Sequence, residues 1–178
     1  STLITSAGLK ELAKSSSIEI LHLDYNKHLK GSDLIPVADM KRIARTTVEG
    51  IPFDDASLKR FSESEHLSEV GFCQGDFTDE GVKNFFGKPQ FTVLAFMSKG
   101  VTDKVVGGLC EMKQLTWLDV SGSSITPEGL STLRSALPKT TILPASPSGA
   151  AVPLPPIDPK RDAQERASFE WLIKIKAY

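Results

Sequence analysis

The sequence has no excess of basic residues. Its 178 residues include 21 Lys and Arg against 22 Asp and Glu, so the formal net charge is -1. Surfaces that bind nucleic acid or anionic membranes need a basic excess, and the composition therefore argues against a nucleic-acid partner. The sequence also lacks any uninterrupted apolar run of the ~18–20 residues that a membrane-spanning helix requires, so no membrane span is expected.

Cysteine and histidine are scarce as well, with two Cys and three His in the chain. Cys73 and Cys110 can form at most one disulfide, and neither has a second cysteine at the close spacing typical of zinc sites. The stretches "GKPQF" and "SGSS" lack the Gly-Lys-Ser/Thr spacing of a phosphate-binding loop. The sequence therefore predicts no metal site and no cofactor.

The overall composition is that of a globular protein, with 40% hydrophobic and 24% charged residues. The length suits one compact domain with an appendage. Because the chain starts at Ser1, we expect a processed protein or an excised piece. The sequence is consistent with either a cytoplasmic or an exported protein.

What the sequence does contain is an internal repeat of about 24 residues. If the first residue of each unit is position zero, apolar residues recur at offsets 0, 5, 8, 14, 17 and 19. All slots are apolar except those of Thr46, Lys139 and Pro144. About six units follow one another, and they begin at Ile4, Leu29, Phe53, Phe77, Val101 and Ile125.

Each unit combines two periodicities. Offsets 5 and 8 lie on one face of a short helix, and offsets 17 and 19 lie on one face of a short strand. Pro36 falls inside the helical slot of the second unit, where we expect an irregular helix, and Pro127 suits the first position of the last helix. A residue whose side-chain oxygen can cap the helix stands at offset 1 in five units: Thr5, Asp54, Thr78, Thr102 and Thr126.

A unit of this length cannot bury its own apolar face, but stacked units can share one core. The sequence therefore predicts an α/β solenoid with strands on one side and helices on the other. The acidic residues in "FDDAS" and "TDEG" are expected to serve helix starts, where negative charge is favoured.

The units "VTDKVVGGLCEMKQLTWLDVSGSS" (101–124) and "ITPEGLSTLRSALPKTTI" (125–142) resemble the short bacterial leucine-rich repeats of the pattern "ITDxGLxxLxxLxxLxxLxLSGT", which belong to the ribonuclease-inhibitor-like superfamily. The resemblance covers about residues 1–143. It implies a right-handed βα superhelix with parallel strands on the concave face and helices on the convex face. It also implies a segment of a larger bacterial protein that binds other proteins.

A proline-rich linker over 144–160 is predicted to separate the repeats from a final segment over 161–178. This segment resembles the "(D/E)RAxxEWLL" stretch that caps some leucine-rich repeat arrays. It could open a second array, or it could fold back over the first repeat, because ~50 Å of linker at ~3.1 Å per residue exceeds the ~24 Å of a six-strand sheet. It could also pack on the first repeat of a neighbouring molecule, which would form a swapped dimer. In the folded-back arrangement we expect Trp171 to be buried.

The strand residues at offsets 16, 18 and 20 should face away from the core. They are polar in the early units and apolar in the later ones, where Trp and Met are typical interface anchors. The sequence therefore predicts a binding surface for a protein or peptide, made of His22, Arg45, Cys73, Val93, Ala95, Met97, Trp117 and Asp119. Two alternatives remain open: the chain's own linker or tail covers this surface in a structural scaffold, or the assumed register is wrong.

An enzyme is the third class of function to weigh. Cys73 and His22 could act as nucleophile and base, but the predicted register puts them two strands apart, about 9.6 Å sideways. That distance is beyond hydrogen-bond reach. The sequence thus predicts no catalytic residue, and it favours a non-enzymatic protein-interaction module.

Overall fold

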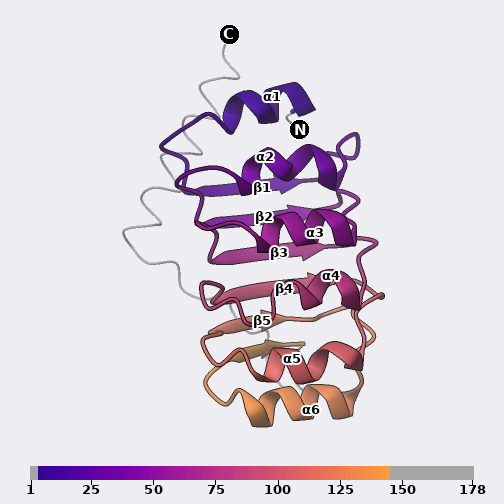
Figure 1. The fold of residues 1–178 in the computed structure, drawn as a ribbon. Helices are drawn as coiled ribbons and strands as arrows, with labels where there is room; N and C mark the ends of the chain where they lie inside the picture. Colours follow the sequence, from indigo (N-terminus) through magenta and orange to yellow (C-terminus); the bar gives the residue numbers. More distant parts are fainter. Residues whose placement is uncertain (1–3, 145–178) are drawn as a thin grey trace. The chain divides into compact units, whose positions relative to one another are not determined.

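The computed structural model describes residues 4–144, and within them helices and strands alternate along the chain (Figure 1). The strands are β1 (Ile20–Asp24), β2 (Arg45–Glu49), β3 (Glu69–Cys73), β4 (Val93–Met97), β5 (Trp117–Asp119) and β6 (Thr141–Leu143). The helices are α1 (Ser6–Leu12), α2 (Ile35–Ala38), α3 (Asp55–Ser62), α4 (Asp79–Lys83), α5 (Val106–Cys110) and α6 (Pro127–Ala136). Two short 3-10 helices, η1 (Gly31–Leu34) and η2 (Asp103–Val105), lead directly into α2 and α5.

The six strands form one open parallel sheet in the order β1-β2-β3-β4-β5-β6. The helices stack beside the sheet in the same order and make a second layer along it (Figure 1). Each strand and helix contacts mainly its counterpart in the next repeat. The predicted α/β class and the parallel, repeat-like arrangement are therefore confirmed, and the architecture is compatible with a βα solenoid.

The strand register follows the sequence repeat. Leu94 of β4 pairs with Leu118 of β5, and Leu118 pairs with Ile142 of β6. All three side chains are buried in one hydrophobic core cluster. Equivalent positions of successive units thus stand side by side in the sheet, as a shared core requires.

Phenylalanine dominates the middle of this core. Seven rings are almost fully buried, and Phe72 lies at their centre. Its ring centroid is 4.7 Å from that of Phe53 and 5.4 Å from that of Phe61. It is 6.2 Å from that of Phe85 and 6.3 Å from that of Phe96. These separations lie in the range in which aromatic pairs attract one another, so Phe72 links the cores of neighbouring repeats.

Thr46 shows how a polar residue fits a predicted apolar slot. Its side chain is fully buried in the β2 strand. The Thr46 hydroxyl donates a hydrogen bond of 3.0 Å to the carbonyl oxygen of Leu21. Because the bond satisfies the hydroxyl, burial carries little penalty, and the core continues through this position.

The predicted helix starts are also confirmed. The side chains of all five predicted capping residues accept a hydrogen bond from a backbone N–H in the first turn that follows. Pro127 occupies the first turn of α6. In the second unit, η1 runs into the four-residue α2, which has Pro36 in its first turn. This division agrees with the irregular helix expected there.

A ladder of aspartates joins the helix starts of successive repeats. The carboxylate of Asp55 accepts hydrogen bonds from the Thr78 backbone N–H at 2.7 Å and from the Thr78 hydroxyl at 2.8 Å. Asp79 binds the same two groups of Thr102 at 2.7 and 2.8 Å. Asp103 binds those of Thr126 at 2.9 and 2.8 Å. The sequence analysis placed such acidic residues at helix starts but did not predict this link between repeats.

Glycine is required beside the first rung of the ladder. A Cβ atom at Gly81 would lie 2.5 Å from Oδ1 of Asp55. The Gly81 backbone N–H donates to that same oxygen at 3.0 Å. A side chain here would therefore push the carboxylate away from the groups that it binds.

We expect Gly81→Ala to lower the free energy of unfolding by about 1–3 kcal/mol, because a tightly packed site rarely accepts an added methyl group without strain. Gly107 in α5 is the matched control, since a Cβ there meets nothing within 4 Å. Gly107→Ala should stabilise the protein by about 0.5–1 kcal/mol through helix propensity. Urea denaturation of both variants measures the difference, and equal effects of the two substitutions would contradict the clash.

Candidate functional site

The face of the sheet opposite the core carries all eight residues of the predicted binding surface. They fall into three rows that cross the strands, because the parallel register aligns equivalent positions. The first row includes Arg45, Val93 and Trp117, the second includes His22, Ala95 and Asp119, and the third includes Cys73 and Met97. The predicted residues are thus brought together on adjacent strands.

The half of this face over β1–β3 is a network of polar side chains. Arg45 and Glu69 form an ion pair between neighbouring strands, and their side chains are 16% and 10% exposed. His22 Nδ1 lies 2.5 Å from the Thr47 hydroxyl oxygen. These contacts run across the strands and pair polar groups of neighbouring repeats. We expect this half to be rigid and polar.

The other half of the face is apolar. Cys73, Val93, Ala95 and Met97 are half-buried side chains on β3 and β4. Together with Trp117 on β5 they form what is called the apolar patch below. Trp117 is only 4% exposed, although it alternates with the core residue Leu118 and lies outside the core cluster.

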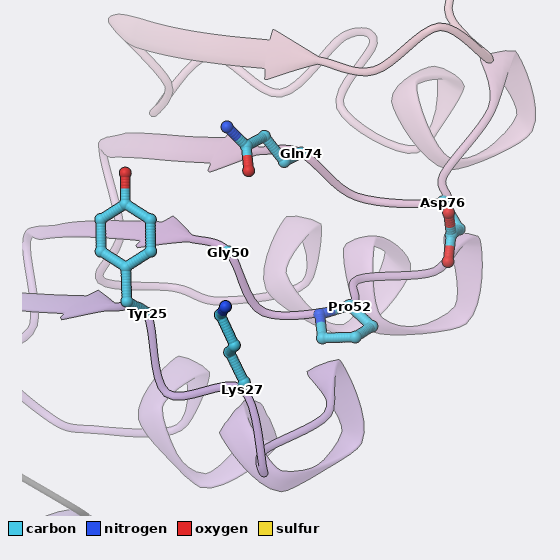
Figure 2. Close-up of a pocket in the computed structure, with 6 residues that line it drawn as sticks. All are labelled: Tyr25, Lys27, Gly50, Pro52, Gln74 and Asp76. Atoms are coloured by element: carbon cyan, nitrogen blue, oxygen red, sulfur yellow. The ribbon is translucent and has the colours of Figure 1, made fainter.

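A second feature, which the sequence analysis missed, is a pocket where the first three strands end (Figure 2). It has a volume of about 380 Å³ and is formed by the segments that follow β1, β2 and β3. Its lining residues are Tyr25, Lys27, Gly50, Pro52, Gln74 and Asp76. It is called the strand-end pocket below.

The backbone at the pocket repeats one unusual conformation. Tyr25, Gly50 and Gln74 each directly follow a strand and have positive φ angles of 55°, 66° and 66°. Gly122 after β5 has φ 71°. The repeat spacing could have indicated their equivalence, because all four stand at offset 21. The left-handed conformation at Tyr25 and Gln74 has no sequence signal, since it is uncommon outside glycine.

The two residues weighed as a nucleophile and base stay apart. In the register, Cys73 aligns with Glu49, whereas His22 aligns with Thr47. The two are therefore two strands and two residues apart, as predicted. On the helix side, burial raises the pKa of the Cys110 thiol, which keeps this thiol protonated and unreactive at neutral pH.

Within residues 4–144, no three His, Cys, Asp or Glu side chains come together as metal ligands would. No helix in the same described part is long and apolar enough to cross a membrane.

Comparison with known proteins leaves the family open. A scan against protein-family models found no match, and a search of curated proteins also found none.

Proposed function

We propose that this chain is a leucine-rich repeat solenoid of the short bacterial type, with its sheet on the concave face, and that it serves as a non-enzymatic module for binding a protein or peptide. The repeat length, the single parallel sheet and the one-sided helix layer support the repeat class. Such solenoids offer an extended sheet surface to their partners.

One observation carries the binding function. The apolar patch lies on the sheet face that is not packed against the helices, and a sheet face in water is ordinarily polar. On the neighbouring strand β3, Met97 aligns with Cys73, Ala95 with Gly71 and Val93 with Glu69. Met and aromatic side chains are enriched at protein interfaces, and Trp is among the residues that contribute most of the binding energy there.

Site-specific photo-crosslinking tests this function. A photoreactive amino acid at Ala95 should give a discrete adduct with a partner in cells that express the full chain, and Met97→Lys should abolish that adduct. The matched control is the same amino acid at Ala56, an exposed alanine on α3. An adduct from Ala56 but not from Ala95 would place the interface on the helix side and contradict the proposal.

A second candidate function is a structural one, in which the apolar patch is already occupied within the native protein. The 4% exposure of Trp117 outside the core cluster favours it. The double substitution of Met97 and Trp117 by Ser separates the two functions. A loss of several kcal/mol in unfolding free energy supports internal packing, as for other buried aromatic side chains. Unchanged stability with loss of the adduct supports an interface.

A further inference from the structure

The six strands carry almost no positive charge. Arg45 is the one Lys or Arg among the residues of β1–β6, and it forms an ion pair with Glu69. The other Lys and Arg residues of the described chain lie on helices and in loops. Glu49 on β2 and Asp119 on β5 add negative charge to the sheet face opposite the core. That face is therefore acidic, although the whole chain has a formal net charge of only -1.

Two carboxylates bracket the apolar patch. Glu49 aligns with Cys73 and lies on one side of the patch. Asp119 aligns with Ala95 and lies on the other side, on the same strand as Trp117. Both acidic side chains are half-buried. A strand spacing of ~4.8 Å and a rise of ~3.3 Å per residue put their Cα atoms ~14 Å apart across the strands and ~16 Å apart in all.

Neither carboxylate is paired with a cation inside the described part of the chain. Glu49 accepts a hydrogen bond from the Tyr25 hydroxyl, and Oδ1 of Asp119 accepts one from the Ser121 backbone N–H at 2.8 Å. Within residues 4–144, no ion pair joins either carboxylate to Lys or Arg. Because both donors are neutral, the two negative charges are available to a cation on a ligand.

The sign of this charge decides between classes of ligand. Nucleic acids and other phosphate-bearing ligands are repelled by an acidic surface. The Lys and Arg side chains of a protein partner instead form charge-assisted hydrogen bonds with carboxylates. An apolar side chain between them can be buried against Ala95 and Met97. Complementary charge around an apolar centre suppresses wrong partners and fixes the register of the right one.

The distance between the carboxylates suits an extended peptide. Alternate side chains of an extended chain point to the same side, so residues i, i+2 and i+4 face the sheet together. The first and last of these are ~13 Å apart along the chain. Long Lys or Arg side chains at the two ends can therefore reach Glu49 and Asp119, while the middle residue lies over the apolar patch.

From these observations we infer that the apolar patch binds an extended segment of a protein partner in which one apolar residue stands between two basic residues, each separated from it by one position. The basic side chains pair with Glu49 and Asp119, and the apolar side chain packs on Ala95 and Met97. The inference rests on the proposed function of the patch and specifies the chemistry of its partner.

Amide chemical shifts in the full chain test the inference, with acetyl-Lys-Thr-Leu-Thr-Lys-amide as the probe. We expect saturable shifts at residues 93–97 and 117–119 at millimolar peptide, because so short a peptide gives weak affinity. The control peptide, acetyl-Glu-Thr-Leu-Thr-Glu-amide, keeps the apolar residue and reverses both charges, so it should bind at least tenfold more weakly. Raising NaCl from ~50 to ~500 mM should weaken binding of the basic peptide at least threefold, because salt screens exposed charges.

Two double variants locate the charges that matter. Glu49→Gln with Asp119→Asn removes both charges and keeps an acceptor oxygen at each position. This protein should therefore fold and lose at least threefold in affinity for the basic peptide. Glu111→Gln with Glu128→Gln makes the same change in net charge at exposed positions of the helix layer. This control should leave the affinity unchanged.

Three results would each overturn the inference: equal binding of the two peptides, unchanged affinity of the Glu49→Gln and Asp119→Asn double variant, or no shift with the basic peptide. The photo-crosslinked adduct from Ala95 tests the proposed function itself. If that adduct forms while any of the three results is obtained, the patch is still an interface and only the chemistry inferred for its partner is wrong.

Discussion

Replacing Phe72 with alanine is expected to lower the free energy of unfolding by about 3–5 kcal/mol, the usual range for a fully buried phenylalanine. The Phe72 side chain is 1% exposed, and its ring contacts five others from the third and fourth repeats. The substitution leaves a cavity that rigid neighbouring rings cannot fill. Many single domains are stable by only ~5–15 kcal/mol, so the substitution should remove a large share of the total stability.

Phe86→Ala is the matched control for this prediction. Phe86 is partly buried and packs against the edge of the core rather than inside it. Its removal should therefore have a clearly smaller effect. Chemical denaturation at equilibrium provides both values, and Phe72→Leu should recover much of the loss because it refills most of the volume. A similar loss for Phe72→Ala and Phe86→Ala would show that the aromatic cluster does not dominate the core.

Removing one rung of the aspartate ladder should have the second largest effect. We expect Asp79→Ala to lower the free energy of unfolding by about 2–4 kcal/mol, because two charge-assisted hydrogen bonds are lost. Asp79 is only 7% exposed. Without it, the backbone N–H and the hydroxyl of Thr102 lose their acceptor at a part-buried site. Thermal and urea denaturation measure the change.

A double-mutant cycle with Thr102→Val isolates the contact itself. If the rung is formed as described, the two substitutions together should destabilise the protein by less than the sum of their separate effects. Asp79→Asn serves as a second control, because it keeps the shape and one acceptor oxygen but loses the charge. Additive effects within about 0.5 kcal/mol would mean that the two residues act independently.

Much of the fold could be predicted because repetition makes the local pattern redundant. Each unit repeats the same helical and strand spacing, so an exception such as Thr46 or Pro36 does not obscure the register. The alternation within strands also predicted which residues lie opposite the core, from Arg45 on β2 to Trp117 on β5. These features follow from a spacing of apolar residues that recurs in each unit of the chain.

Other features depend on contacts between repeats, which no local pattern encodes. Asp55 and Thr78 are far apart in sequence, and their hydrogen bonds form only when the units stack. The positive φ of Tyr25 is likewise imposed by the fold, as is the strand-end pocket beside it. The strand spacing placed Trp117 opposite the core but did not predict its 4% exposure. The predictions for the linker over 144–160, for the segment over 161–178 and for Trp171 lie outside the described residues.

The uneven distribution of aromatic rings has a consequence for how the stack opens. Within residues 4–144, all seven buried phenylalanines lie between Phe53 and Phe96, in the third and fourth repeats. The first repeat instead holds aliphatic side chains that are only partly covered, among them Leu12, Ile18 and Leu21. In a linear array where each unit is stabilised by its neighbours, fraying starts at the end with the weakest interface. Amide hydrogens of β1 should therefore exchange with solvent by local opening, whereas those of β3 and β4 should exchange only through global unfolding.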